Sequence, residues 1–234
     1  MSGIVGPNII TDGLIFAVDA ANPDSYISGS TVWKDQTPNG NNGTLTNGPI
    51  FNSANAGVLE FDGSDDYVSV GNPTFLQLTG AMTIDFWING QPTTTGHYAG
   101  FDKLGNSSNR GAGLDLRKAT GIYLYIASNS STLVETHTTD TTPLTDGNWH
   151  HVVGTYDPGT SMKIYLDGVE VSSKTSSVPA SQYNAGSNEW SIAKRSAHSN
   201  PLNGKMASVK MYDRALSAAE VSQNYNALKT RFGL

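Results

Sequence analysis

Residues 148–171 read NWHHVVGTYDPGTSMKIYLDGVEV, and apolar side chains alternate there with polar ones. Two short runs rich in β-branched and aromatic residues lie within it, at 149–156 and 162–166, and a third begins in it and continues beyond it, at 169–174. Such runs are typical of strands that bury one face. Asp167 and Gly168 separate the last two runs, and both residue types tolerate the positive φ angles of a two-residue hairpin turn. The stretch therefore predicts consecutive antiparallel strands.

The same pattern continues on both sides of this stretch. Further runs of strand-forming residues lie at 14–19, 58–61, 67–70, 82–88, 98–103, 112–117, 121–127, 134–138, 189–193 and 206–211. The 25 glycines and 10 prolines of the chain supply turns between them. About a dozen short strands joined by turns are typical of a sandwich, whereas a parallel α/β fold alternates strands with helices. We predict an all-β fold, a two-sheet antiparallel jelly-roll sandwich with one short C-terminal helix.

The helix is expected near the C-terminus, at about 217–230. Ser217 stands three residues before Glu220, which is the spacing of a capping box. Leu216 and Val221 stand at the positions of a hydrophobic staple around this cap. Residues 1–12 show no clear alternation, so we expect an N-terminal arm there. A single domain at 13–234, which includes the helix, would follow the arm.

The composition argues against several classes of protein. The 234 residues include no cysteine, so disulfides and thiolate metal sites are excluded. The formal net charge is −6 and no basic run occurs, which predicts no nucleic-acid partner. No apolar stretch approaches the roughly 20 residues that span a bilayer, so no membrane association is expected. Residues 1–10 lack the features of a secretory signal, which predicts use in the cytosol or release by a route other than secretion.

Five segments, taken in order, resemble the laminin-G-like, concanavalin A-like lectin/glucanase superfamily. They are FDGSDDYVSV at 61–70, MTIDFWI at 82–88, NWHHVVGTYD at 148–157, KIYLDGVEV at 163–171 and LNGKMASVKMYDRALSAAEV at 202–221. They appear in the family's order and cover most of residues 58–225. The resemblance implies a two-sheet antiparallel jelly roll, in agreement with the strand pattern.

The opening of the chain narrows this resemblance. Residues 13–49 contain DAANPDSY, a Trp-x-Asp at 33–35 and NGNNGTLTNGP, and residues 217–234 read SAAEVSQNYNALKTRFGL. These phrases resemble versions of the domain in virion structural proteins of tailed, especially marine, bacteriophages. The resemblance implies a protein on the exterior of the phage particle, as capsid decoration or tail fibre, with other virion proteins as partners. The arm at 1–12 and the C-terminal helix would be its docking elements, and we expect a homo-oligomer.

Two other functions stay open. The first is a lectin-like carbohydrate-binding module without a structural role, with a polysaccharide as its partner. The second is a glycan hydrolase, because glucanases of the superfamily carry Glu-x-Asp-x-Glu on one strand. Glycoside hydrolysis needs two carboxyl groups, about 5–5.5 Å or 6.5–9.5 Å apart. No such pattern includes any of the five glutamates, Glu60, Glu135, Glu170, Glu189 and Glu220. We therefore predict a protein that is not an enzyme and has no catalytic residue.

Calcium is the metal that the sequence favours, as a structural ion. Ca²⁺ takes about 6–8 oxygen ligands, and the candidate carboxylates are Asp19, Asp62, Asp65 and Asp66. Aspartates that stabilise turns are the alternative interpretation. Members of the family often carry an acidic pair in the last strand, where this chain reads MASVKMY at 206–212. That departure removes two ligands, and no other cofactor is predicted.

The histidines do not predict a zinc site. His150 and His151 are adjacent, so on a strand they point to opposite faces and cannot both bind one ion. The others stand alone in Ser/Thr-rich contexts: His97, His137 and His198.

Glycan binding would use aromatic rings and fixed polar groups. The candidate residues in or beside predicted loops are Tyr98, Arg110, Asn129 and Arg195. Tryptophans embedded in strand patterns are expected in the core instead. These are Trp87, Trp149 and Trp190.

Overall fold

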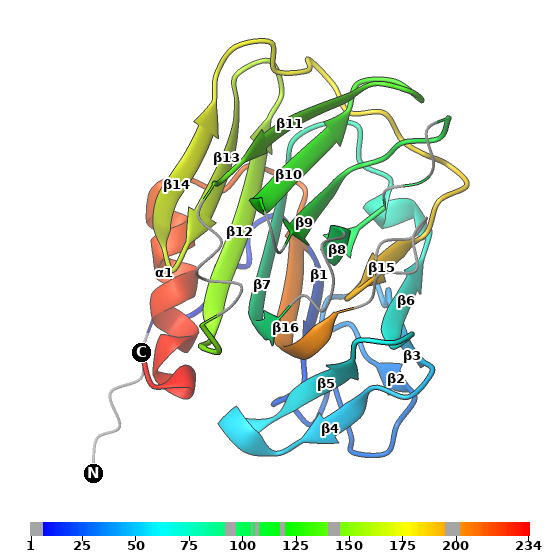
Figure 1. Ribbon diagram of the computed structural model, residues 1–234, viewed down its shortest axis with the longest axis vertical. Helices are drawn as coiled ribbons and strands as arrows, with labels where there is room; N and C mark the ends of the chain where they lie inside the picture. Colours follow the sequence, from blue (N-terminus) through cyan, green and yellow to red (C-terminus); the bar gives the residue numbers. More distant parts are fainter. Residues whose placement is uncertain are drawn as a thin grey trace.

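The computed structural model describes residues 7–91, 97–103, 105, 108–117, 120–139, 146–194 and 202–234. Its strands form two antiparallel sheets that stack face to face, with one α-helix outside them (Figure 1). The predicted all-β sandwich with a C-terminal helix is therefore confirmed. No helix in the described part of the chain is long and apolar enough to cross a membrane.

Sheet A places the last strand of the chain near its centre. Its order is β14 (Val169–Lys174), β13 (Ser161–Leu166), β12 (His150–Asp157), β7 (Met82–Gln91), β16 (Asn203–Tyr212), β5 (Val58–Asp62) and β4 (Ile50–Asn52). β1 (Leu14–Asp19) also pairs with β16. β16 therefore joins three strands that come from much earlier parts of the chain.

Sheet B lies opposite. Its order is β11 (Leu133–His137), β10 (Gly121–Ala127), β9 (Gly113–Arg117), β8 (His97–Asp102), β15 (Trp190–Ile192), β6 (Tyr67–Gly71), β3 (Gly43–Thr46) and β2 (Val32–Trp33). β4 and β2 lie at the same end of the sandwich, each as the terminal strand of its sheet (Figure 1).

The inner faces of the two sheets enclose the main hydrophobic core. Phe16 of sheet A stacks on Phe101 of sheet B with ring centroids 5.4 Å apart, and Phe101 contacts Trp190 at 4.8 Å. All three side chains are at most 2% exposed. Because successive strand residues face opposite sides, the residues between the core positions form the outer faces. The tryptophans expected in the interior, Trp87, Trp149 and Trp190, are all buried.

Two local signals of the sequence are confirmed. Asp167 and Gly168 adopt φ angles of 51° and 81° in the turn between β13 and β14. Ser217 caps α1 (Ala218–Leu228), and its backbone N–H donates to the carboxylate of Glu220 at 2.8 Å, which completes the capping box. A hydrogen bond from Arg214 lowers the pKa of Glu220 to about 2. This cap fixes where the chain leaves sheet A and begins the helix.

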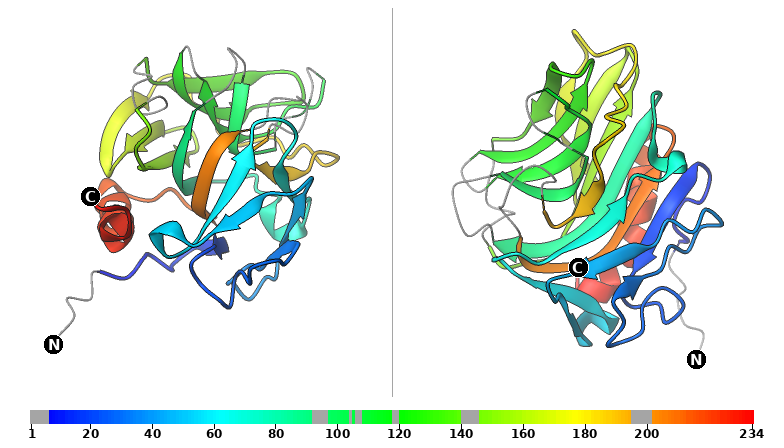
Figure 2. Two further views of the ribbon diagram at one scale, coloured as in Figure 1. Left: turned by 60° about the horizontal axis from the view of Figure 1, so that its bottom comes forward. Right: turned by 90° about the vertical axis from the view of Figure 1, so that its right-hand side faces the viewer.

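The helix α1 closes the outer face of sheet A. The Trp87 ring of β7 stacks on His151, Tyr225 and Phe232 at centroid distances of 5.1, 5.7 and 4.3 Å. Phe232 belongs to the short 3₁₀ helix η4 (Lys229–Phe232) that follows α1. Figure 2 shows α1 and η4 against this sheet. The part of the outer face around Trp87 is therefore an interior surface.

A polar network is buried with these rings under α1. The carboxylate of Asp85 lies 3.2 Å from Lys210 Nζ and 3.1 Å from His151 Nε2, and it accepts a hydrogen bond from Asn224 Nδ2 at 2.8 Å. All four residues are at most 4% exposed. Burial alone raises the pKa of Asp85, but Lys210 and His151 outweigh it and hold this pKa well below its usual value. Asp85 is therefore an ionised carboxylate inside the protein.

Candidate functional site

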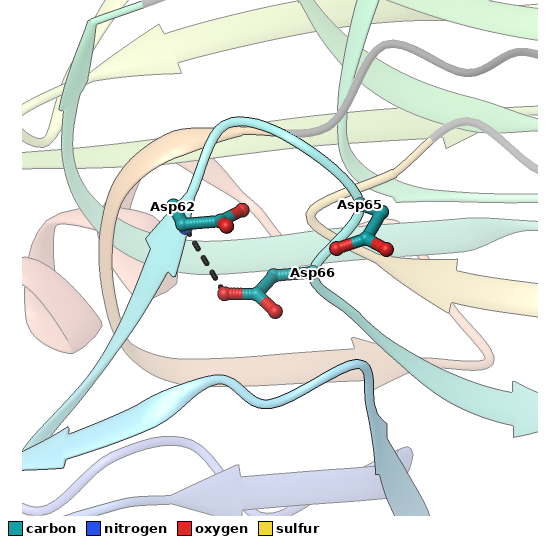
Figure 3. Close-up of side chains that lie close together, drawn as sticks. All are labelled: Asp62, Asp65 and Asp66. Atoms are coloured by element: carbon teal, nitrogen blue, oxygen red, sulfur yellow. Dashed lines mark hydrogen bonds between the residues drawn. The ribbon is translucent and has the colours of Figure 1, made fainter.

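Three carboxylates converge at the turn between β5 and β6 (Figure 3). Asp62, Asp65 and Asp66 each offer one oxygen, and these oxygens lie within 4.8 Å of one another. Asp62 and Asp65 are exposed, whereas Asp66 is buried and accepts a hydrogen bond from the Asp62 N–H at 3.1 Å. The backbone N–H of Ser64 donates to Asp62 at 2.8 Å. The turn is therefore ordered by its own aspartates, and it presents carboxylate oxygens outward.

The electrostatics of this turn suit a hard cation. Burial raises the pKa of Asp66, and the nearby charges of Asp62 and Asp65 raise it further. Hydrogen bonds from the backbone, first from Ser64, lower the pKa of Asp62. A cation with oxygen ligands would relieve the repulsion among these groups. Asp19 does not join them, because Arg231 Nη1 lies 2.8 and 3.1 Å from its two carboxylate oxygens.

Calcium binding at this turn stays a prediction. If an ion binds there, saturating CaCl₂ raises the melting temperature by several degrees and a chelator reverses the rise. The variant Asp65→Asn is expected to lose the response, while Asp24→Asn, which changes an exposed aspartate outside the cluster, keeps it. Differential scanning calorimetry with and without EDTA measures the effect. An unchanged midpoint in the native protein would leave only the turn-stabilising role.

A second group of polar and aromatic side chains lies on the outer face of sheet B. In β9, β10 and β11, the outward positions are those between the core residues. Tyr123 stands opposite Asp115 on one side and His137 on the other, and Tyr125 stands opposite Glu135. In the part of the chain that is described, no helix lies over these three strands (Figure 2). This face therefore differs from the helix-covered outer face of sheet A.

Arg117, Tyr123, Tyr125 and His137 form a stack across these strands. The Arg117 guanidinium lies 3.7 Å from the Tyr123 ring centroid and 5.1 Å from that of Tyr125. Tyr123 stacks on Tyr125 at 5.6 Å and on His137 at 4.6 Å. The two tyrosines are buried, Arg117 is half-buried, and the His137 side chain is 42% exposed. The tyrosines thus hold Arg117 and the exposed ring of His137 in fixed positions.

Two carboxylates share the outer face of sheet B with this stack. Asp115 stands opposite Tyr123, and Asp102 stands opposite Gly113 on the neighbouring strand β8. Both side chains are 0% exposed.

The structure brings together only part of the predicted glycan-binding set. Arg110 and Asn129 lie at adjacent loops, since the Arg110 N–H donates to the Ser130 carbonyl at 2.9 Å. The Asn129 side chain accepts hydrogen bonds from the N–H groups of Ser131 and Thr132, so it stabilises its own loop. Tyr98 is a β8 residue opposite Leu116, and its side chain lies outside the described part of the structure. Arg195 also lies outside the described residues.

The comparison with family profiles identifies the domain. The profile described as the concanavalin A-like lectin/glucanases superfamily matches residues 62–222, which is more than half of the chain. The chain belongs to this superfamily. No curated protein matches it in sequence.

Solved structures share the superfamily fold at low sequence identity. The binding domain of Paraclostridial Mosquitocidal Protein 1 has 15% identity and a TM-score of 0.72 over 92% of this chain and 52% of that chain. Domain 4 of AbnA, a GH43 extracellular arabinanase from Geobacillus stearothermophilus in complex with arabinotriose, has 18% identity and a TM-score of 0.67 over 91% and 98%. The receptor-binding domain of a botulinum neurotoxin C/D mosaic has 14% identity and a TM-score of 0.70 over 92% and 51%. This chain spans about half the length of the two toxin domains, and these likenesses show the fold alone.

The glycan-binding residues predicted from the sequence did not include the stack of Arg117, Tyr123, Tyr125 and His137, although the sequence contains a signal for part of it. Residues 121–127 read GIYLYIA, in which Tyr123 and Tyr125 alternate with three aliphatic residues. With the aliphatic side chains in the core, the period of 2 places both tyrosines on the outer face. The contribution of Arg117 and His137 depends on which strands become neighbours, and no local pattern gives that.

The two histidines of β12 lie on opposite faces of sheet A, each beside its own carboxylates. His151 points to the outer face under α1 and is 0% exposed, beside Asp85. His150 lies opposite the core residue Ile88, and its ring contacts two other carboxylates, with Nδ1 2.8 Å from Asp167 and Nε2 3.2 Å from Asp146.

His150 makes the stability of the domain depend on pH. Partial burial lowers the pKa of His150, but the hydrogen bond to Asp167 and the charges of Asp167 and Asp146 outweigh it, so this pKa lies above its usual value. The stabilisation is then complete below about pH 6.5, the unfolded value. It is lost as the pH rises through the folded value. We expect His150→Gln to lower the melting temperature at pH 5.5 and to have a smaller effect at pH 9.

The matched control for this pH dependence is His137→Gln, because the His137 side chain is 42% exposed and lies 3.9 Å from its nearest carboxylate. Its effect on the melting temperature should stay small at both pH values. A loss in His150→Gln that is equal at pH 5.5 and pH 9 would contradict the assignment.

Proposed function

We propose that this chain is a non-enzymatic binding module whose ligand is a glycan. The observation that carries the proposal is the stack of Arg117, Tyr123 and His137 on a sheet face that no described helix covers. Its exposed groups are the His137 imidazole and the Glu135 carboxylate, with side chains 42% and 44% exposed, beside the half-buried Arg117. A sugar is bound by fixed polar groups that form hydrogen bonds with its hydroxyls, and by rings that pack against the apolar face of the sugar ring.

The named relatives support a binding role. The arabinanase domain was solved in complex with arabinotriose, and the toxin domains are described as binding domains. The burial of Asp102 and Asp115 supports the non-enzymatic part of the proposal. Incubation of the protein with laminarin-type and alginate-type polysaccharides should therefore release no reducing ends above a boiled control.

A glycan array followed by calorimetric titration tests the proposal. Arg117→Ala should weaken binding of the best glycan about 10- to 100-fold, because a charged hydrogen bond contributes about 1.5–3 kcal/mol. The control is Lys229→Ala, which removes a cation 5.4 Å from the Tyr225 ring on the helix side of sheet A. It should bind as the native protein does. A native protein that binds no glycan on a broad array would refute the proposed function.

We also propose that the module acts on the exterior of a phage particle, as capsid decoration or fibre, in contact with other virion proteins. Support comes from the sequence phrases at 13–49 and 217–234. The arm and α1 also lie together, since Gln223 Nε2 donates to the Asn8 carbonyl and the Ile10 N–H donates to Asn224 Oδ1, both at 2.8 Å. They could thus dock on a neighbour as one surface. Co-purification with assembled particles in a fixed copy number is expected, and its absence from purified particles would exclude this role.

A further inference from the structure

A groove opens at the end of the sandwich where β4 and β2 are the terminal strands. It lies between the turn at 26–31 and the segment at 47–51, which crosses from sheet B to sheet A, and its volume is about 500 Å³. Both segments precede residues 62–222, which the superfamily profile matches. The volume falls within the roughly 300–1,000 Å³ of ligand pockets. The groove is therefore built by a part of the chain that lies outside the profile match.

Hydrogen bonds hold both walls of the groove. Tyr26 donates its hydroxyl to the Ser30 carbonyl at 2.9 Å, and the Leu45 N–H donates to the Thr31 carbonyl at 2.8 Å. On the other wall, Asn47 Nδ2 donates to the Asp65 carbonyl at 3.0 Å. The groove is thus preformed, which lowers the entropy cost of binding a ligand.

The lining of the groove combines rings with uncharged polar groups. Tyr26 stacks on Phe51 with centroids 5.5 Å apart, and Ile50 at the mouth is 65% exposed. The polar lining comes from hydroxyl, amide and backbone groups, such as those of Thr31 and Asn47. None of the lining residues carries a charge. An apolar surface with neutral donors and acceptors fits a ligand that has hydroxyl groups and no charge.

The acidic turn beside the groove disfavours ligands that carry a negative charge. Asn47 contacts Asp65 of the acidic turn, in which Asp62 and Asp65 are exposed. These carboxylates would repel uronates and sulfated sugars that lie in the groove. The chain as a whole also carries a net charge of −6.

We infer that this groove is a saccharide-binding site for a neutral oligosaccharide, separate from the stack on sheet B. The inference rests on the proposed glycan-binding function and adds to it a second site and a class of sugar. A protein with both sites can bind one polysaccharide chain at two places, and the second binding event then raises the overall affinity although neither site gains a contact.

Two exposed isoleucines give a matched pair of variants. Ile50 lines the groove, whereas Ile27 is 61% exposed on the turn at 26–31 and its side chain is not part of the lining. Ile50→Glu places a charge at the mouth of the groove, and Ile27→Glu places the same charge beside it. Both variants should keep the native melting temperature, because both side chains are on the surface.

The experiment titrates the native protein, Ile50→Glu, Ile27→Glu and Arg117→Ala with neutral arabino-, xylo- and cello-oligosaccharides and with an oligo-uronate. We expect Ile50→Glu to weaken binding of a neutral oligosaccharide at least tenfold, and Ile27→Glu to change it less than twofold. Sedimentation velocity of the same four proteins reports self-association.

Several results would overturn the inference, and they are distinguishable. If Arg117→Ala weakens binding and Ile50→Glu does not, or if only the oligo-uronate binds, the glycan-binding function stands and the groove is not its neutral site. If Ile50→Glu alone dissociates an oligomer, the occupant of the groove is a second copy of the chain. If the native protein binds no sugar, both the inference and the proposed function fail.

Discussion

Replacing Asp85 with alanine should lower the free energy of unfolding by about 3–5 kcal/mol, because the change leaves buried charge without its partner. Lys210 is 4% exposed and His151 is 0% exposed, and both rely on this one carboxylate. Asn224, which tethers α1 to the same group, also loses one of its two acceptors and keeps only the Tyr212 hydroxyl. Denaturation with urea at pH 7, followed by far-ultraviolet circular dichroism, measures the loss.

The control for Asp85 is an ion pair of the same sheet that faces solvent. Glu170 lies 2.9 Å from Lys163, with side chains 37% and 31% exposed, so Glu170→Ala should cost less than about 1 kcal/mol. The double variant Asp85→Leu with Lys210→Met should recover much of the loss, since apolar side chains can replace a buried pair. A cost in Asp85→Ala no larger than in Glu170→Ala would show that the network adds nothing to stability.

Trp87→Ala should cost about 3–5 kcal/mol, the range for removing a large buried aromatic side chain. The Trp87 ring is 0% exposed and contacts His151, Tyr225 and Phe232 at once, so its removal leaves a cavity between sheet A and the helix. We also expect faster tryptic cleavage after Lys229 and Arg231, because the C-terminal segment loses its main contact.

Two variants bracket the Trp87 result. Trp87→Phe keeps a ring in the site and should retain most of the stability. Phe75→Ala removes a ring that is 58% exposed, and its cost should stay within about 0.5 kcal/mol. If Trp87→Ala unfolds at the same denaturant concentration as Phe75→Ala, the contact between α1 and sheet A does not stabilise the domain.

Features encoded by neighbouring residues were predictable. The turn at Asp167 and Gly168 depends on two residue types, and the cap at Ser217 depends on Glu220 three positions later. Strand positions follow from alternation over five to eight residues, and this pattern is the same whichever strands become neighbours in the sheet. The same alternation places Trp87 on the outer face of β7, and its burial there comes from the packing of α1 and η4.

Features that join distant residues were not predictable. Asp85 and Lys210 are 125 positions apart, and Asp19 and Arg231 are 212 apart. The candidate calcium set therefore included Asp19 as an available carboxylate, although Arg231 occupies it in the fold. The stack of Arg117, Tyr123 and His137 needs β9, β10 and β11 as neighbours, and alternation says nothing about order. The groove at 26–51 depends on where the two sheets end, which no single segment determines.

The central place of β16 has a consequence for biosynthesis. Its last residue is Tyr212, so β1, β5 and β7 are translated long before the strand that connects them exists. During that interval their unpaired edges can associate with other nascent chains. Fragments that stop before residue 203 retain this hazard permanently, and they are expected to aggregate rather than to form a smaller sandwich.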